Sequence, residues 1–358
     1  MINLLNITYP EFESLIVTTL QEKTYRAMQI WQWVWQKQIT DIESMTNLPQ
    51  KIRASLTALI KINLPEIVTI QQSSDGTKKF LLRLSDGALI ETVLIPSIDK
   101  AGNIRITQCL SSQVGCSMGC TFCSTATMGF IRNLTAGEIV SQVLLAKLHL
   151  NDNKPDKPII RNIVFMGMGE PLLNLTELTR ALHILHSEKG LNFSARRITV
   201  STCGIKKGIQ ALSENGLAFL ALSLHASNQE LRSTIMPKAA KWDLKELIDT
   251  LKNYSLKKRE KITFEYLLLG GINDSPEHAK ELAKLITDIK GKLNLIPYNP
   301  AQGQPYLKPT EENILKFQKV LWSKGIVTIL RKSKGQDINA ACGQLKTTYL
   351  SQSSSTIY

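Results

Sequence analysis

A strand–helix alternation that repeats over most of the chain limits the fold more than any other feature. From about residue 104, short apolar runs alternate with stretches of helical periodicity. The runs predicted to be strands are 104–110, 161–166, 197–201, 218–224, 262–268, 293–297 and 326–331. Repeated βα units imply parallel strands, and their number favours a barrel over an open sheet. We therefore predict an α/β fold built on a partial (β/α)6 barrel of the TIM type.

Segments of helical periodicity fit between these strands. Thr135 and Glu138 form a capping box ahead of an apolar stretch that begins at Ile139. The other predicted helices are 175–186, 207–214, 244–256, 276–289 and 311–324. The barrel with a C-terminal segment is expected to occupy 101–346, followed by a polar tail at 347–358.

The residues before the barrel have a different character. Residues 1 to about 75 show helical periodicity, so 1–75 is predicted to be a small helical domain. Trp31, Trp33 and Trp35 alternate and cannot all share one helical face. Four basic residues could place positive charge outside: Arg26, Lys37, Lys51 and Arg53. The domain is either an RNA-binding module or an ordinary packed helical unit.

A hairpin is predicted to link the two parts at 76–100. Asp86 and Gly87 separate two apolar runs, which is a hairpin signal. Glu91 lies within the second run. A glutamate in a strand usually lies on the solvated face, so its position alone does not indicate function.

The charge balance points to a polyanionic partner. The 358 residues carry a formal net charge of +13, which favours nucleic acid over an ordinary basic protein. The amino end lacks the pattern of a signal peptide, and no stretch approaches the ~20 apolar residues of a membrane span. We predict a cytoplasmic protein. Six cysteines in such a chain do not indicate a secreted disulfide framework.

Three of these cysteines fall within eight residues, as Cys-x3-Cys-x2-Cys: Cys116, Cys120 and Cys123. A structural zinc site uses four ligands, and an iron–sulfur cluster normally takes four thiolates. No fourth cysteine or nearby histidine completes the set. Three thiolates on a four-iron cluster would leave one iron open to a small molecule.

Other polar groups follow the predicted strands at the end where barrel active sites form. They are Gly169-Glu170 after the second strand, Ser201 at the third, Ser223-Leu224-His225 at the fourth and Asn299 after the sixth. Each alone is explained by a turn or a buried histidine. Their shared edge with the three cysteines favours a functional site.

The cysteine loop after the first strand of such a barrel resembles the radical S-adenosylmethionine superfamily. Further segments resemble the RlmN/Cfr family of RNA methyltransferases within it, over nearly the whole chain. These segments are 90–93, 109–116, 123–126, 165–172, 223–225, 296–300 and 341–345. The segment between Glu91 and Cys109 is a few residues longer than the family pattern and is expected to extend a loop around 97–103.

The resemblance implies a radical methyltransferase that modifies C2 of adenine in 23S rRNA and in tRNA. Cys116, Cys120 and Cys123 would hold one 4Fe–4S cluster. Two molecules of S-adenosylmethionine would be used per turnover, one as methyl donor and one as radical source. The positions implied to bind S-adenosylmethionine are Gly169, Glu170, Ser201, Ser223, Leu224, His225 and Asn299.

Three further positions gain roles from the resemblance. Cys342 would carry the methyl group, Cys109 would release the product through a transient disulfide, and Glu91 would accept the C2 proton. Cys203 matches no functional position and is predicted to be a small buried hydrophobe. The basic stretch 331–335 is expected near the RNA backbone. An external electron donor such as flavodoxin and a monomeric state are also expected.

Two alternatives remain open. The first is a Cfr-like enzyme acting on C8 of adenine, which would confer antibiotic resistance; Pro171, Pro297 and 124–126 look more like the C2 enzyme. The second is a non-catalytic, zinc-bearing RNA-binding protein. The missing fourth ligand, with Cys109 and Cys342 elsewhere in the chain, argues against it.

Overall fold

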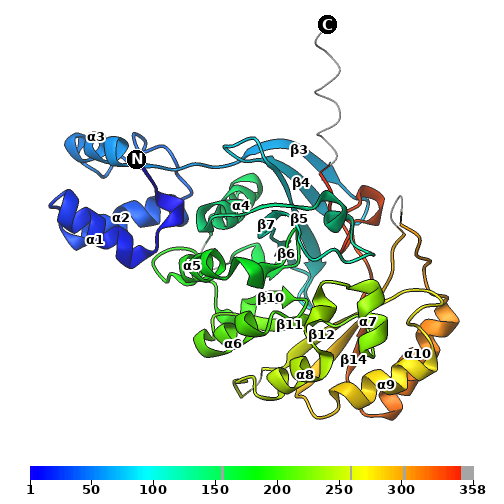
Figure 1. The fold of residues 1–358 in the computed structure, drawn as a ribbon. Coiled ribbons are helices and arrows are strands. Elements are labelled where there is room, and N and C mark those ends of the chain that lie inside the picture. The colour runs from blue at the N-terminus through cyan, green and yellow to red at the C-terminus, as the bar shows by residue number, and fades with distance from the viewer. Residues whose placement is uncertain (155–156, 259, 301–303, 348–358) are drawn as a thin grey trace, which may run out of the picture.

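A single ten-stranded sheet forms the centre of the computed structural model, which describes residues 1–154, 157–258, 260–300 and 304–347. Seven of its strands are parallel and form the barrel wall, in the order of the chain (Figure 1). They are β6 (Ile104–Cys109), β9 (Ile160–Phe165), β10 (Ile198–Thr202), β11 (Phe219–Ser223), β12 (Ile262–Leu268), β13 (Gly291–Pro297) and β14 (Thr328–Leu330). β14 is an end strand of this sheet and does not pair with β6. The barrel is therefore incomplete, as predicted.

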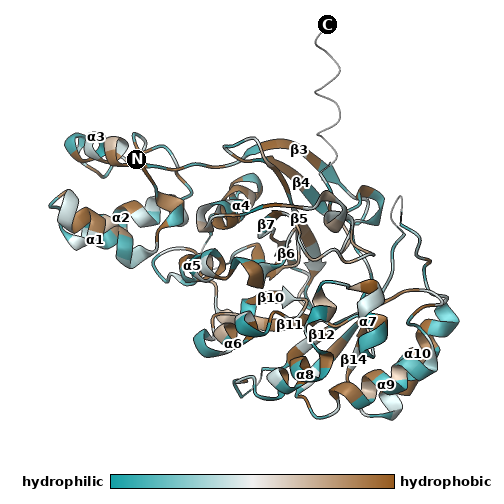
Figure 2. Cartoon of the chain, in the orientation of Figure 1, coloured by the Kyte–Doolittle hydropathy of each residue, from teal (hydrophilic) through white to brown (hydrophobic). Residues whose placement is uncertain are grey.

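Helices follow six of these strands, so the (β/α)6 prediction is confirmed, with β14 as a final strand. They are α4 (Ala136–Leu150), α5 (Leu175–His186), α6 (Lys206–Asn215), α7 (Gln229–Ile235), α8 (Leu244–Lys252), α9 (Pro276–Ile286) and α10 (Glu311–Ser323). The predicted capping box begins α4: Glu138 N–H donates to Thr135 Oγ1, and Thr135 N–H donates to the Glu138 carboxylate. Figure 2 shows hydrophobic residues in brown along much of the central sheet, whereas much of the outer surface of α9 and α10 is hydrophilic.

Three helices precede the sheet: α1 (Tyr9–Thr19), α2 (Thr24–Trp35) and α3 (Gln50–Leu59). Trp31 and Trp35 are buried, with ring centroids 5.5 Å apart. Trp33 points elsewhere and donates from Nε1 to Asn47 Oδ1 at 2.5 Å. The expectation that the three tryptophans do not share one face is confirmed.

The prediction that residues 1 to about 75 are helical is wrong at its C-terminal end. Residues Glu66–Gln72 form β3, which pairs antiparallel with β4 (Lys78–Arg83). The cause is the run Ile67-Val68-Thr69-Ile70, because β-branched residues favour extended backbone.

The hairpin at Asp86-Gly87 is confirmed, but it is part of the main sheet rather than only a linker. β5 (Leu89–Ile98) pairs with β4 on one side and with β6 on the other. The long segment before Cys109 also forms a hairpin, because Ile98 pairs with Ile104 and Asp99 N–H donates to Asn103 O. Strands β3–β5 thus extend the barrel wall and place Glu91 beside the residues that follow β6, where Ser111 Oγ donates to Glu91 O at 2.6 Å.

Within the described residues, four short strands lie outside the main sheet. β1 (Ile2–Asn3) pairs with β2 (Ile60–Lys61), and β7 (Gln113–Gly115) pairs with β8 (Phe130–Asn133). No helix within the described ranges has the length and apolar character to cross a bilayer. The predicted polar tail lies outside the described residues from 348 onward.

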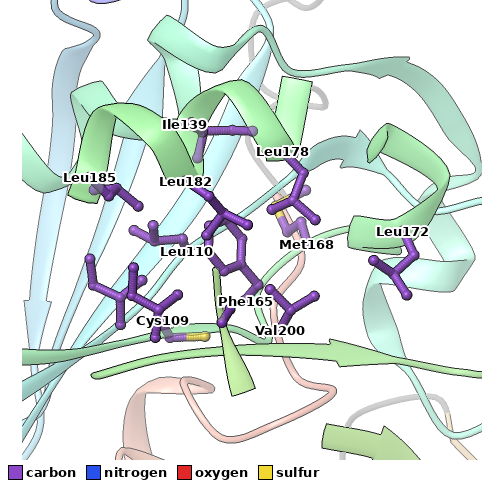
Figure 3. Close-up of a cluster of buried hydrophobic side chains, with 14 of the residues drawn as sticks. Cys109, Leu110, Ile139, Phe165, Met168, Leu172, Leu178, Leu182, Leu185 and Val200 are labelled. Atoms are coloured by element: carbon purple, nitrogen blue, oxygen red, sulfur yellow. The ribbon is translucent and has the colours of Figure 1, made fainter. Parts of the chain in front are cut away.

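An apolar cluster packs the wall behind the site. Figure 3 shows Leu110 and Phe165, from the ends of β6 and β9, meeting Leu178 and Leu182 of α5, with Cys109 at the edge. These side chains are nearly fully buried. At about 1.5–3 kcal/mol for each fully buried side chain of this size, the cluster holds β6, β9 and α5 in fixed relation.

Candidate active site

A pocket opens at the carboxyl ends of the parallel strands. Nine predicted site residues line it: Cys116, Cys120, Cys123, Gly169, Glu170, Ser201, Ser223, His225 and Cys342. Cys203 and Glu265 line it as well. Four predicted residues, Glu91, Cys109, Leu224 and Asn299, lie outside its lining.

The three-cysteine loop follows β7 and is held by backbone hydrogen bonds. Cys116 N–H donates to Gly129 O at 2.8 Å, and Thr121 N–H donates to Ile235 O at 3.0 Å. Gly115 has a φ of +72°, and a Cβ there would lie 1.9 Å from Gly129 O. Glycine is therefore required where the chain enters the loop.

Burial disfavours the charged form of the loop thiols. It raises the pKa of Cys116 to about 12 and raises the pKa values of Cys120 and Cys123 above the ordinary range. Mutual repulsion adds to the effect at Cys120. Three thiolates here need a cationic partner, and sulfur ligands suit the irons of an iron–sulfur cluster. Within the described residues, no three Cys, His, Asp or Glu side chains converge on the position of one metal ion.

Glu170 is a buried carboxyl on the pocket wall. Its Oε2 accepts from Cys203 N–H at 2.8 Å, and its Oε1 accepts from Leu172 N–H at 3.2 Å. Burial raises the pKa of Glu170 despite these hydrogen bonds. None of the described residues that line the pocket is Lys or Arg. A ligand that brings an ammonium group would therefore stabilise the ionised carboxylate.

His225 is neutral and fixed in orientation. Its Nδ1 accepts from Leu267 N–H at 3.0 Å, so the ring carries its proton on Nε2. Burial, together with Arg232, lowers the pKa of His225 to about 3. The ring packs edge-on against Phe122 of the cysteine loop, with centroids 5.1 Å apart. An aromatic contact thus joins β11 to the loop.

Hydroxyl and carboxylate groups complete the far wall. Ser201 Oγ and Ser223 Oγ lie 3.1 Å apart. Glu265 is buried; its Oε1 accepts from Asn294 Nδ2 at 2.9 Å, whereas its Oε2 has no hydrogen-bond partner among the described residues. Sequence reasoning missed Glu265, because a glutamate inside an apolar strand gives no signal of which face it occupies.

The segment that carries Cys342 returns over the pocket from the end of β14. Ser124 N–H donates to Gly343 O at 2.7 Å, and Thr125 Oγ1 donates to Leu345 O at 2.6 Å. Cys342 is therefore held beside the cysteine loop, with its side chain accessible from the pocket. Although Cys342 is accessible, the surrounding protein displaces water from the thiol and raises its pKa, and the Arg331 charge partly offsets this.

Glu91 holds this segment rather than facing the pocket. Its Oε1 lies 3.0 Å from Lys79 Nζ, and its Oε2 accepts from Lys346 N–H at 2.9 Å. Lys79 Nζ also donates to Asn339 O at 3.3 Å. The side chains of Lys79 and Glu91, both buried, thus hydrogen-bond the backbone on both sides of Cys342. We call this pair the Lys79–Glu91 clamp. Burial raises the pKa of Glu91, and Lys79 opposes the increase.

Cys109 and Cys203 are both buried, but of the two only Cys109 has a pKa that is raised by Cys342. Burial raises the pKa of Cys109 to about 12, and the neighbouring Cys342 adds to the rise. Cys203 is 4% exposed, which confirms the prediction that it is buried.

Leu224 and Asn299 make structural contacts outside the pocket lining. Leu224 is fully buried, and its carbonyl accepts from Arg232 Nη1 at 2.8 Å. Asn299 Nδ2 donates to Ser333 Oγ at 2.6 Å, which ties β13 to the basic stretch 331–335.

Two family models match the chain. The model described as Radical SAM superfamily covers residues 110–286. The model described as Ribosomal RNA large subunit methyltransferase N-terminal domain covers residues 2–62. The second match thus ends before β3, as the helices do.

Known proteins resemble the chain over nearly its full length. The Dual-specificity RNA methyltransferase RlmN of Nitratidesulfovibrio vulgaris (strain Hildenborough) is 62% identical over 98% of this chain and 96% of its own. That of Campylobacter lari is 45% identical over 96% and 97%. A radical SAM methyltransferase from Sphaerobacter thermophilus superposes with a TM-score of 0.89 at 41% identity, over 97% of this chain and 99% of its own. These relatives do not favour the Cfr-like alternative. The chain belongs to the RlmN family of dual-specificity RNA methyltransferases, within the radical SAM superfamily.

Proposed function

We propose that this chain transfers a methyl group to C2 of adenine in 23S rRNA and in tRNA. Relatives named as dual-specificity RNA methyltransferases match it over 98% of its length. The observation that carries the proposal is the position of Cys342, which faces the same pocket as the three loop cysteines. A pocket that needed only a metal-bound cofactor would not require this additional thiol.

Membership of the radical SAM superfamily implies a 4Fe–4S cluster and S-adenosylmethionine. We assign Cys116, Cys120 and Cys123 to the cluster, and Glu170 beside Gly169 to the ammonium group of S-adenosylmethionine. When bound, these groups supply a carbon radical that can take hydrogen from a methyl group, chemistry that no side chain provides. Ser201, Ser223 and the unpartnered oxygen of Glu265 offer polar contacts for the remainder of that ligand. Leu224, His225 and Asn299 would shape this side of the site.

Cys342 acts as the methyl carrier in this proposal. C2 of adenine is electron-poor, so an electrophilic methyl group cannot be transferred to it directly. A thiolate can accept such a methyl group first, because the thiolate is the nucleophilic form of cysteine. The Arg331 charge lowers the pKa of Cys342 against the effect of burial and so favours that form. One S-adenosylmethionine would methylate Cys342, and a second would serve as radical source.

Glu91 and Cys109 act after the carbon is joined to the RNA. Glu91 accepts the C2 proton, which requires its ionised form, and the Lys79 cation favours that form. The adduct also has to give up one electron, which would return to the oxidised cluster. Cys109, as thiolate, then attacks the Cys342 sulfur and forms a disulfide, the bond between that sulfur and the transferred carbon breaks, and the electron pair left on the carbon takes up a proton to give the methyl group of the product. In the conformation described here Glu91 is bound to Lys346 N–H, so the clamp has to release the segment before Glu91 reaches a substrate.

The remaining expectations concern surroundings rather than the site. We expect a monomer that takes electrons from an external donor such as flavodoxin. A cytoplasmic location fits a disulfide that is transient and catalytic.

Mass spectrometry of ribosomal RNA and tRNA tests the function. RNA from a strain lacking this gene should lose 2-methyladenosine, and complementation with the wild-type chain should restore it. A complemented strain that gains 8-methyladenosine instead would establish the C8 alternative. Anaerobically purified protein that is colourless and carries stoichiometric zinc would contradict the radical assignment.

A further inference from the structure

A second cavity lies at the opposite end of the barrel, where β9 and β10 begin. Arg161 stands at the start of β9, and Arg196 and Arg197 immediately precede β10. Trp35 and Gln36, at the end of α2, form the facing wall. We call this cavity the basic groove.

Positive charge in the basic groove exceeds the negative charge. Lys147 is neutralised by Asp152, whose carboxylate lies 2.9 Å from Lys147 Nζ. Within the described ranges, Arg161, Arg196 and Arg197 form no ion pair. Apart from Asp152, the acidic residue among the described residues of the lining is Glu188.

The arginines stand close enough to repel one another. Burial lowers the pKa of Arg197, and the charges of Arg196, Arg105 and Arg161 lower it further. Arg197 Nη1 donates to Asn162 Oδ1 at 3.3 Å, an uncharged partner that leaves its charge unbalanced. Holding like charges together costs free energy that an anionic ligand would recover.

Both walls of the basic groove are fixed. Gln38 Nε2 donates to Asp152 O at 2.6 Å, and Gln36 Nε2 donates to Lys189 O at 3.2 Å. Trp35 is 1% exposed and locks the end of α2. These contacts fix the end of α2 against the barrel, so the backbone that forms the groove is in place before any ligand arrives.

We propose that the basic groove binds the phosphodiester backbone of the substrate RNA, at a part of the molecule remote from the target adenine. Guanidinium groups match phosphate oxygens in geometry as well as in charge. Strands of five or six residues separate this groove from the catalytic pocket, a span of about 17–20 Å. An RNA that reaches both sites must extend well beyond its target loop. The inference rests on the proposed function, because that function makes RNA the substrate.

The test compares a groove variant with a control of equal charge change. Arg196→Gln/Arg197→Gln removes two groove cations, and Lys245→Gln/Lys280→Gln removes two exposed cations from α8 and α9. Binding of full-length tRNA is measured over a range of salt concentrations. The groove variant should bind about tenfold more weakly, and its log–log salt slope should be shallower by about 1.8, as expected for two lost phosphate contacts. The control should match the wild type.

A short hairpin that carries only the target loop separates the possible failures. The groove variant should bind and methylate this hairpin as the wild type does. Arg196→Lys/Arg197→Lys should recover the salt slope for tRNA and part of the affinity, because lysine restores the charge but not the guanidinium geometry. Unchanged tRNA affinity and salt slope would overturn the inference, even if inorganic phosphate binds the groove. An equal loss on the hairpin would also overturn it, by placing the contact near the target base. A wild-type enzyme that methylates neither RNA would instead defeat the proposed function.

Discussion

Two segments bring cysteines to the same pocket, and they are held there in different ways. The loop of Cys116, Cys120 and Cys123 is bound by its own turns and by backbone hydrogen bonds to neighbours. The segment of Cys342 shares a backbone hydrogen bond with that loop, from Ser124 N–H to Gly343 O, but its other anchors are largely side-chain contacts with distant parts of the chain. Asp337 accepts from Ser73 Oγ and Ser74 N–H, Asp75 accepts from Gly335 N–H, and the Lys79–Glu91 clamp binds either side of Cys342.

The difference separates a fixed element from a detachable one. Lys238 Nζ also donates to Ser117 O at 2.6 Å, but loss of one such side chain should leave the cysteine loop in place, because its backbone hydrogen bonds to Gly129 and Ile235 remain. Loss of an anchoring side chain can release the Cys342 segment while the barrel stays folded. This is the behaviour that a methyl-carrying cysteine needs if it meets a cofactor, an RNA base and Cys109 in turn.

The largest effect should follow from substitutions in the fixed loop. Methylation should be abolished in each of three variants: Cys116→Ala, Cys120→Ala and Cys123→Ala. The anaerobically purified variants should also lack the iron of an intact cluster, about four atoms per chain. Cys203→Ala is the matched control, because Cys203 lines the same pocket and is bonded through its backbone to Glu170. It should keep the iron. Iron and sulfide analysis of the four variants decides the assignment, and iron loss in Cys203→Ala alone would reverse it.

The two cysteines outside the loop should fail at different stages. Cys342→Ala should lose turnover together with the covalent methyl group that intact-protein mass spectrometry detects on the wild type. Cys109→Ala should keep that methyl group and trap RNA on the protein, because the thiol proposed to attack the Cys342 sulfur is gone. Denaturing electrophoresis with labelled RNA shows the trapped species. Free turnover by Cys109→Ala would remove Cys109 from the mechanism.

The sequence predicts the cysteine loop better than the Cys342 segment, and the reason is the way each segment is held. Spacing alone identifies Cys116, Cys120 and Cys123, because the three cysteines lie within eight residues of one another. Strand periodicity then places Glu170, Ser201, Ser223 and His225 on the same edge. Cys342 and Glu91 were placed only by resemblance, since no periodicity relates a residue after β14 to one in β5.

Other features were beyond sequence reasoning for physical reasons. A lysine in a hairpin strand is normally exposed to solvent. Lys79 is buried beside Glu91 because the Cys342 segment folds over it. Strand β3 was missed because helical periodicity and short β-branched runs overlap in the stretch 60–72. Arg161 and Arg197 come together only when β9 and β10 pair.

An intermediate effect should follow from breaking the Lys79–Glu91 clamp. In the proposed mechanism Glu91 has to be ionised to accept a proton, so activity should rise with pH through its pKa. Lys79→Met removes the cation that lowers this pKa, and the acid limb of the pH–rate profile should move to higher pH. The loss at a fixed pH should be about tenfold for each unit by which the pKa exceeds that pH.

Lys78→Met is the control for this substitution, because Lys78 precedes Lys79 on β4 but lies next to His149 instead. Its acid limb should stay where the wild type has it. A Lys79→Met enzyme that is slower at every pH by the same factor would show that Lys79 serves only to hold the segment.

The smallest effect should come from the outer anchor of the detachable segment. Although burial opposes it, hydrogen bonds from Thr77 and from Gly335 N–H lower the pKa of Asp75 to about 2. The folded-state pKa is below the ordinary 3.8, so the carboxylate stabilises the anchored segment above pH 3.8, and this is lost as the pH falls toward 2. Asp75→Ala should therefore speed amide hydrogen exchange over 335–345 at neutral pH and leave global unfolding nearly unchanged.

Asp86→Ala is the control, because it removes a turn aspartate that pairs with Arg132 instead. Exchange over 335–345 should not change in this variant. Equal acceleration in both variants would mean that the segment opens with the whole sheet, and the distinction between fixed and detachable cysteines would then fail.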